Sequence, residues 1–226
     1  MNWEETGYLL SKRKFRENAN IINVFTPTYG RVSGIVYGGN SRKIRNHLQI
    51  SNKIFFFYKA KNDSKIGYFK TELDTPIAPK YFNDKKRSAA LLSFTSLLNN
   101  LLPESQPYQN IYLSLSNLMD NFDNKDWYFL YVIWELNLIK ELGFDFNLDS
   151  YKNLSKDLNK IVSLNIDGVK YEIPNLLIHN KIPEIINSTL IRKSFIFTRS
   201  IMLNKFFIPN DMRFPKARIL LENFFN

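Results

Sequence analysis

The amino-acid sequence predicts a multidomain α+β protein, with a small β-barrel at its N-terminus and a mostly helical region after it. Short β-branched and aromatic runs, separated by glycine, proline and asparagine, fill about the first 75 residues, whereas helical spacing of apolar residues begins at Ser88. The segment DTPIAPKYFNDKKR, residues 74–87, separates the two patterns with two prolines and a run of mixed charge. We therefore predict one domain over residues 1–80 and a second over residues 81–226.

Five segments of the first domain have the composition of β-strands, and no helix is predicted between them: residues 7–15, 21–26, 31–37, 54–60 and 67–73. Alternation would place Leu9 and Arg13 on one face of the first strand and Tyr8 and Lys14 on the other. In the fourth strand, alternation would turn at least two of the three phenylalanines inward. Five short strands in this length predict a five-stranded OB-fold barrel.

The second domain is predicted to be mostly helical, with helices over residues 88–102, 108–122 and 126–142. The last of these, DWYFLYVIWELNLIKEL, is apolar nearly all round, which predicts a buried central helix. Asp167 and Gly168 lie between two β-like runs and predict a small β-hairpin at residues 161–173. Residues 189–207 and 214–225 are predicted to form the terminal helices.

Composition limits the classes of protein that the chain can belong to. Its 44% hydrophobic and 15% aromatic residues can build a core, and the lack of cysteine excludes disulfides, thiolate metal sites and cysteine nucleophiles. The N-terminal segment MNWEETGYLL has acidic residues where a signal peptide has basic ones, and no apolar run is long enough for a membrane span. We expect a soluble protein of the cytoplasm.

Positive charge is concentrated at the two ends of the chain. The net charge of +10 divides into +8 for residues 1–80 (14 Lys and Arg against 6 Asp and Glu), −3 for residues 81–191 (10 against 13) and +5 for residues 192–226 (7 against 2). A bias of the whole genome towards lysine would not be confined in this way. The N-terminal excess therefore indicates a surface that binds a polyanion.

No constellation of catalytic residues is apparent. We expect His47 to be a polar loop residue and His179 a core or surface residue, because neither has a partner at metal-ligand spacing. The segment GGNSRK lacks the order of a phosphate-binding P-loop, and the group Asp120, Asp123 and Asp126 has the spacing of a solvated helix end. We expect no enzymatic activity, no cofactor and no metal.

The stretch GRVSGIVYGGNSRKIR, residues 30–45, contains four of the 8 glycines of the chain. Gly30 suits a turn with positive φ, Gly34 suits a bulge or a close backbone approach, and the Gly38-Gly39 turn could meet a phosphate. Tyr37 and Tyr29 are candidates for stacking on bases. With Tyr37, the predicted nucleic-acid-binding residues are Arg13, Lys14, Arg31, Arg42, Lys43 and Arg45.

The sequence resembles the recombination mediator and DNA repair protein family RecO, in its alphaproteobacterial form. The resemblance rests on GYLLSKRKFRENANIINVFTPTYGRVSGIVYGGNSRKIRNHLQ, residues 7–49, and is supported by LPESQPYQNIYLSLSNLMDNF and WELNLIKELGFDFNLD. Glu17 and Gly30 match the early glutamate and turn glycine of the family, whereas Ile50 stands where its members commonly have proline. Many members carry a cysteine zinc site near residues 147–175, and this chain has no cysteine there.

The resemblance implies an OB barrel on a helical domain, binding of single- and double-stranded DNA, and annealing of complementary strands. It also implies three partners, namely RecR, the acidic tail of the single-stranded-DNA-binding protein and, indirectly, RecA, which the protein would help to load in the RecF pathway at the nucleoid. The basic residues around Arg31 and Arg42–Arg45 would then lie on the DNA and RecR surface. The acidic tail would suit the C-terminal segment, which is poor in acids, through Arg192, Lys193, Arg199 and Lys205.

Our leading hypothesis is a DNA-annealing factor without catalytic residues. An RNA-binding OB-fold module is an alternative, because composition does not separate the two and only the resemblance favours DNA. A basic adaptor that meets an acidic protein is a third reading, and a nuclease is the fourth.

Overall fold

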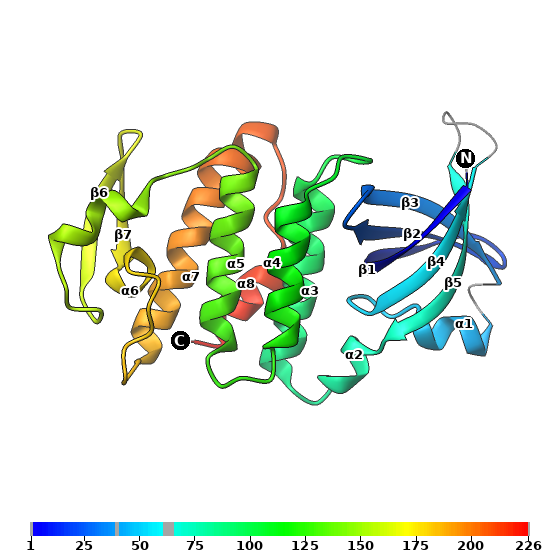
Figure 1. The fold of residues 1–226 in the computed structure, drawn as a ribbon, viewed down its shortest axis with the longest axis horizontal. Coiled ribbons are helices and arrows are strands. Elements are labelled where there is room, and N and C mark those ends of the chain that lie inside the picture. The colour runs from blue at the N-terminus through cyan, green and yellow to red at the C-terminus, as the bar shows by residue number, and fades with distance from the viewer. Residues whose placement is uncertain (1, 39–40, 61–65, 226) are drawn as a thin grey trace. The chain divides into compact units, whose positions relative to one another are not determined.

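The computed structural model describes residues 2–38, 41–60 and 66–225, with the backbone alone at Arg42 and Lys43. The chain forms two compact units, Met1–Tyr112 with Pro215–Arg218, and Leu113–Phe214 with Ile219–Asn226 (Figure 1). The predicted domain boundary after residue 80 stays a prediction.

Five strands at the N-terminus form a closed barrel (Figure 1). Their order is β1-β2-β3-β5-β4, and neighbouring strands pair antiparallel except for a short parallel pairing of β3 with β5. The predicted five-stranded OB-fold is confirmed. The strands are β1 (Asn2–Arg16), β2 (Ala19–Thr26), β3 (Gly30–Tyr37), β4 (Lys53–Lys59) and β5 (Gly67–Thr75).

The barrel interior is filled by aliphatic side chains and two phenylalanine rings, Phe56 and Phe69. Gly34 passes close to the second ring, since a Cβ atom there would lie 2.5 Å from Phe69, and the predicted close approach is confirmed. Phe55 and Phe57 lie outside the core, and Phe57 is exposed. The expectation that at least two phenylalanines of this run point inward was wrong, because Tyr58 takes the next inward position and packs against the core.

The first strand does not alternate as predicted. A register shift between Leu9 and Ser11 lets Tyr8, Leu9 and Leu10 all be buried. Leu9 belongs to the barrel core, while Tyr8 packs outside the barrel against Phe94 and Tyr112. The bulge therefore allows one strand to serve two apolar contacts.

A helix, α1 (Arg42–His47), lies between β3 and β4, where no helix was predicted. Its N-cap is Ser41, whose side-chain oxygen accepts a hydrogen bond from the backbone N–H of Ile44. With six residues, the helix is too short to show an apolar period in the sequence. Ile44 secures it by packing against the barrel core.

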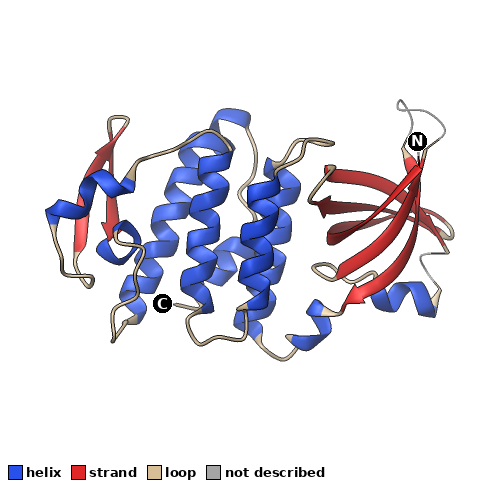
Figure 2. Cartoon of the chain, in the orientation of Figure 1, coloured by secondary structure: helices blue, strands red, loops and turns tan. Residues whose placement is uncertain are grey.

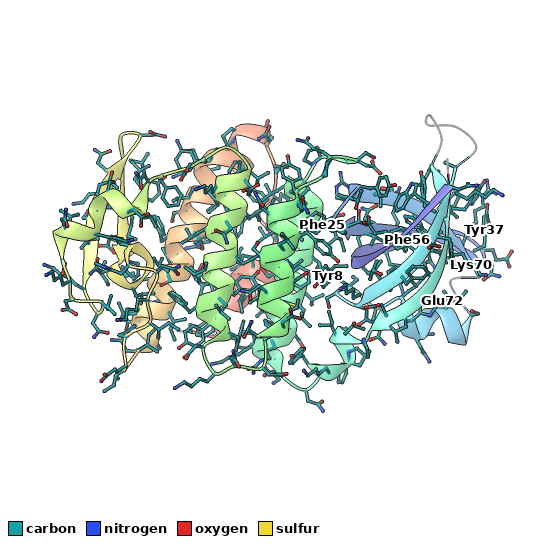
Figure 3. All side chains as sticks on the ribbon, in the orientation of Figure 1. Tyr8, Phe25, Tyr37, Phe56, Lys70 and Glu72 are labelled. Carbon is teal, nitrogen blue, oxygen red and sulfur yellow. The ribbon has the colours of Figure 1, made fainter. Side chains whose placement is uncertain are left out.

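The rest of the first unit covers one side of the barrel. Two helices follow β5, namely α2 (Ile77–Lys80) and α3 (Lys85–Leu101). Figure 3 shows Tyr8 and Phe25 on the side next to α3, and Tyr37 and Lys70 on the opposite side. The amide of Asn23 on β2 donates to the side chain of Asn99 on α3 at 2.7 Å.

The second unit consists of helices with one two-stranded sheet (Figure 2). Helix α4 (Gln109–Asp120) spans the division between the units, and the other elements follow in chain order. They are α5 (Trp127–Glu141), the 3-10 helix η1 (Leu148–Leu154), β6 (Ile161–Ile166), β7 (Val169–Pro174), α6 (Asn175–Ile178), α7 (Ser188–Met202), the π-helical turn η2 (Leu203–Phe207), the 3-10 turn η3 (Ile208–Asn210) and α8 (Lys216–Asn223).

Helix α5 is buried on several faces, as predicted, and packs against α7. The buried Glu135 on α5 accepts a hydrogen bond from the hydroxyl of Thr198 on α7 at 2.6 Å. The predicted hairpin is confirmed, and Asp167 and Gly168 form its turn with φ of 51° and 80°. The helix predicted over residues 189–207 instead ends at Met202 and continues as the π-helical turn. None of the described helices is long and apolar enough to cross a membrane.

Candidate nucleic-acid interface

The second half of β1 projects cations from the barrel. Arg13 lies opposite Ile21 of β2, and Lys14 lies opposite Asn20. Directly paired residues point to the same face of a sheet. Arg13 therefore shares the outer face with Ile21, whereas Lys14 points to the side of Lys12. Both predicted residues are exposed.

Lys12 connects this strand to the end of α1. Its ammonium group donates a hydrogen bond to the carbonyl oxygen of Leu48 at 2.8 Å. Burial lowers the pKa of Lys12, and the nearby charge of Arg45 lowers it further. Arg45 therefore lies close enough to Lys12 for the two charges to repel each other.

Arg13 and Lys14, from opposite faces of β1, and Arg45, from α1, share a further property, and we call these three residues the basic cluster. Each is exposed, and among the side chains that the structure describes no carboxylate lies within ion-pair distance of any of them. Unpaired cations on a solvated surface keep their charge for an external anion. The basic cluster can therefore contact phosphates without first breaking an ion pair to a carboxylate of the described residues.

Two predicted site residues lie next to the basic cluster in the sequence. Arg42 and Lys43 are the first two residues of α1, but their side chains lie outside the described residues. Gly38 has the positive φ of 68° that a turn requires, and its neighbour Gly39 is also outside the described residues. The predicted phosphate contacts of Arg42, Lys43 and the glycine turn stay predictions.

Arg31 already has contacts within its own unit. Its Nε donates a hydrogen bond to the carbonyl oxygen of Leu102 at 2.8 Å, and its own carbonyl oxygen accepts from the N–H of Ser105 at 2.8 Å. The preceding Gly30 has φ of 66°, as predicted, and a Cβ atom there would lie 1.8 Å from the carbonyl oxygen of Gln106. Arg31 therefore joins β3 to the segment after α3, and only part of its guanidinium is left for a phosphate.

The two histidines have structural contacts. His47 was expected in a loop, but it ends α1, is 8% exposed and has Nε2 2.9 Å from the hydroxyl of Thr71 on β5. That expectation was wrong because α1 was not predicted, and His47 joins this helix to the barrel. His179 is half-buried, and its Nε2 donates to the carbonyl oxygen of Ser155 at 2.8 Å. Among the described residues, no group of three histidine or acidic side chains could hold a metal ion.

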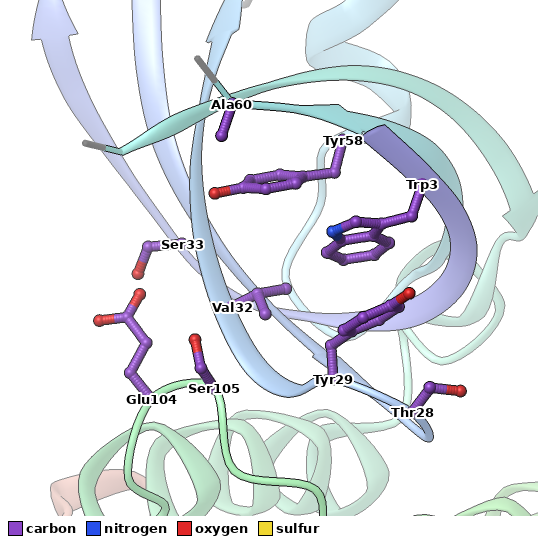
Figure 4. A pocket seen from close by; sticks show the side chains of 9 residues that line it. All are labelled: Trp3, Thr28, Tyr29, Val32, Ser33, Tyr58, Ala60, Glu104 and Ser105. Carbon is purple, nitrogen blue, oxygen red and sulfur yellow. The ribbon is translucent and has the colours of Figure 1, made fainter. Parts of the chain in front are cut away.

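The two predicted stacking residues differ in what covers their rings. Tyr37 is 53% exposed and stacks on Tyr68 of β5 with ring centroids 5.5 Å apart. Tyr29 is half-buried and stacks on Trp3 at 3.8 Å, beside a pocket of about 460 Å³ (Figure 4). Figure 4 shows the ring of Trp3 between those of Tyr29 and Tyr58, so these rings cover one another. Tyr37 is the better placed of the two for a base.

The predicted partner-binding cations of the second unit are mostly ion-paired. Lys193 on α7 pairs with Glu172 of β7, and Lys205 on η2 pairs with Asp167 of the hairpin turn at 2.7 Å. Arg199 has its Nε 3.2 Å from Glu222 of α8, a charge contact without hydrogen-bond geometry. Arg192 is exposed. The hairpin brings carboxylates from a distant part of the chain to Lys193 and Lys205, whereas Arg199 meets Glu222 of its own segment. Partner binding by these four residues stays a prediction.

Sequence reasoning also missed a set of exposed rings on the barrel. Tyr68 and Phe57 are 39% and 42% exposed and lie on the outer face of β5 and β4. Lys59 is the direct partner of Tyr68, and Lys70 is the direct partner of Phe57. Alternation within residues 54–60 and 67–73 was the signal that could have found them, once the inward positions were assigned correctly.

Comparison with known proteins covers both halves of the chain. The family model "Recombination protein O N terminal" matches residues 1–75, and "Recombination protein O C terminal" matches residues 83–159. A protein named DNA repair protein RecO from Roseobacter denitrificans is 35% identical over 151 residues, which cover 66% of this chain and 63% of that protein. The protein of the same name from Wolbachia pipientis wMel is 26% identical over 241 residues, covering 98% of this chain and 99% of that protein.

The alignment with the Roseobacter protein thus spans less than two thirds of that relative. Among solved structures, the asparaginyl-tRNA synthetase of Entamoeba histolytica aligns with 75% of this chain and 39% of its own length at 8% identity. The TM-score of 0.28 is too low to indicate a shared fold. The two family models lie in the order of the two predicted regions, the first over the barrel and the second over the helices that follow. The chain belongs to the recombination protein O family.

Proposed function

We propose that this chain acts in DNA repair and recombination as a mediator without catalytic chemistry, which binds single- and double-stranded DNA and anneals complementary strands. Membership of the recombination protein O family supports the role. The observation that carries the proposal is the basic cluster, with Arg13, Lys14 and Arg45 exposed on an OB-fold barrel and no described carboxylate paired with them.

Annealing needs no reacting side chain. Two complementary strands repel each other through their phosphates, and cations that contact both backbones reduce that repulsion. Contacts to phosphate carry no sequence information, so bases remain free to search for their partners. Each contact also releases condensed counterions, so that affinity falls as salt rises. A basic barrel surface is sufficient for this role.

The proposal includes the partners that the family resemblance implies. The chain would work with RecR in the RecF pathway and help to load RecA, in the cytoplasm at the nucleoid. The acidic tail of the single-stranded-DNA-binding protein would bind the second unit through Arg192, which is exposed. Lys193, Arg199 and Lys205 would contribute only after exchanging their present carboxylates for those of the tail.

Annealing of DNA coated with the cognate single-strand-binding protein tests the proposal. The variant Arg13→Glu/Lys14→Glu/Arg45→Glu reverses the basic cluster without touching Arg31, whose hydrogen bond to Leu102 supports the fold. A matched control, Lys125→Glu/Lys156→Glu/Lys181→Glu, changes net charge equally at exposed positions of the second unit. Melting curves verify that both variants are folded.

We expect the cluster variant to lose most of its annealing rate, and its DNA affinity to fall by about a thousandfold at 0.1 M salt, or about tenfold for each lost phosphate contact. The control should keep both. Equal losses in the two variants would contradict the proposal. Preference for RNA over a DNA strand of matched sequence would instead favour an RNA-binding module.

A further inference from the structure

The outer face of β4 and β5 carries rings and ammonium groups in alternation. Tyr68 pairs across the strands with Lys59, and Lys70 pairs with Phe57, so that each ring has a lysine directly opposite. Tyr37 of β3 adds a third ring by stacking on Tyr68. We call these five residues the aromatic face.

The rings of the aromatic face are open to solvent. Tyr37, Phe57 and Tyr68 are 53%, 42% and 39% exposed, whereas large apolar side chains of a barrel normally turn inward. Figure 3 shows Tyr37 and Lys70 on the same side of the barrel, opposite the side next to α3. Tyr37 and Lys70 also line a groove of about 780 Å³, together with residues of α1 and β5. The face therefore offers both flat rings and a hollow beside them.

The charge of the face suits an anion. Lys59 and Lys70 are exposed, and within the described part of the chain neither has a carboxylate at ion-pair distance. Two acids border it, because Glu4 lies opposite Phe57 and Glu72 lies opposite Phe55. A polyanion would thus follow the side of Tyr37, Tyr68 and the two lysines, and would avoid Phe55.

We propose that the aromatic face binds unpaired bases of single-stranded DNA, with Tyr37, Tyr68 and Phe57 as stacking surfaces and Lys59 and Lys70 as phosphate contacts. The inference rests on the proposed function, namely that this chain binds DNA. Rings accept any base, which suits a protein that anneals without sequence preference. Bases inside a duplex are already stacked, so the face distinguishes single strands from duplexes, whereas the basic cluster binds both.

The pocket beside Trp3 does not offer the same function. Its rings already stack on each other, with Trp3 and Tyr29 3.8 Å apart (Figure 4), so no ring face of that pair is left between them. On the aromatic face, Tyr37 and Tyr68 also stack on each other, with centroids 5.5 Å apart, but both are exposed, whereas Trp3 and Tyr29 are half-buried.

Equilibrium binding of a fluorescent single-stranded oligothymidine tests the inference. Its length is about 15 nucleotides, which spans an OB-fold. The affinity for a duplex of equal length is measured for comparison. The variants are Tyr68→Ala and Phe57→Ala, with Tyr68→Phe as the variant that keeps a ring. Phe82→Ala is the matched control, because Phe82 is an 81% exposed ring that lies on neither β4 nor β5.

We expect Tyr68→Ala and Phe57→Ala each to lower affinity for oligothymidine by about tenfold, with the salt dependence unchanged and duplex affinity retained. Tyr68→Phe and Phe82→Ala should bind as the unchanged protein does. Lys59→Ala should reduce the salt slope for oligothymidine by about 0.7, as one lost phosphate contact on a single strand does.

Unchanged oligothymidine affinity in both alanine variants would overturn the inference, and this is also the result expected if the face docks a protein. An equal loss for oligothymidine and duplex would overturn it too. In either case the proposed function stands if the Arg13→Glu/Lys14→Glu/Arg45→Glu variant loses DNA binding. The proposed function itself fails if the unchanged protein binds neither DNA.

Discussion

The barrel and the C-terminal helices are both basic in sequence, but they differ in how many of their cations are ion-paired. Residues 1–80 carry +8 and residues 192–226 carry +5. On the barrel, the basic cluster has no described carboxylate partner. In the second unit, Lys193, Arg199 and Lys205 each have one. Net charge in a segment therefore does not tell how much of that charge an external anion can use.

The difference follows from what each fold brings near its cations. The second half of β1 pairs with β2, a strand without acidic residues, so sheet formation adds no carboxylate beside Arg13 or Lys14. The β6-β7 hairpin has Asp167 in its turn and Glu172 on β7, and both reach cations of α7 and η2.

The largest effect should come from the glycine that joins the barrel to the segment after α3. Gly30→Ala adds a Cβ atom 1.8 Å from the carbonyl oxygen of Gln106 at a positive φ, and we expect a loss of about 3 kcal/mol in unfolding free energy. Gly168→Ala in the hairpin meets nothing within 4 Å and should cost about 1 kcal/mol from its φ alone. Urea unfolding measures both, and equal losses would contradict the tight contact at Gly30.

Removal of the carboxylates that pair with its cations should let the second unit contribute to DNA binding. Asp167→Asn/Glu172→Gln removes the partners of Lys205 and Lys193, and we expect affinity for DNA to rise by about tenfold at low salt. Asp120→Asn/Glu184→Gln changes net charge equally at exposed positions and should raise affinity by about twofold. The same gain in both variants would mean that pairing does not control these lysines.

A smaller effect concerns the N-caps of one helix in each unit, whose contributions to stability should depend differently on pH. Burial would raise the pKa of Asp84, but hydrogen bonds from the backbone and guanidinium of Arg87 hold it below its usual range. The contribution of this carboxylate to stability is therefore present above about pH 4 and is lost as pH falls through its lowered pKa. Asn187, which caps α7, has no charge to lose.

Alanine substitution at the two caps measures this difference. Asp84→Ala and Asn187→Ala should each cost about 1 kcal/mol at pH 7, since each removes one N-cap acceptor. In acid, the loss should shrink for Asp84→Ala and stay the same for Asn187→Ala. Thermal unfolding at pH 7 and in acid provides the comparison. A loss of stability in Asp84→Ala that is the same at both would contradict the lowered pKa.

Most of the barrel could be predicted from the sequence, because strand composition and turn residues are local signals. The five strands, the close approach at Gly34 and the hairpin at Asp167 and Gly168 are all confirmed. Helix α1 was missed because it is too short for a periodic signal, and His47, which ends this helix, was therefore assigned to a loop. The bulge after Leu9 was missed because it depends on pairing with β2.

The candidate site was predictable only in part. Arg13, Lys14 and Tyr37 are exposed, as polarity indicates for the two cations, although Arg13 and Lys14 lie on opposite faces of β1. The hydrogen bond of Arg31 to Leu102 joins residues 71 apart in the chain, and the carboxylate partners of Lys193 and Lys205 are 21 and 38 residues away. Contacts of this kind arise from tertiary structure, which no local pattern encodes.

The salt dependence of single-stranded DNA binding separates the cations of the barrel from those of the C-terminal helices. Three proteins are compared: the unchanged chain, the barrel variant Arg13→Ala/Lys14→Ala/Arg45→Ala and the helical variant Lys193→Ala/Arg199→Ala/Lys205→Ala. We predict that the slope of log affinity against log salt falls by about two in the barrel variant, at about 0.7 for each lost phosphate contact, and is unchanged in the helical variant. Equal changes of slope in both variants would contradict the claim that only the barrel offers its cations to DNA.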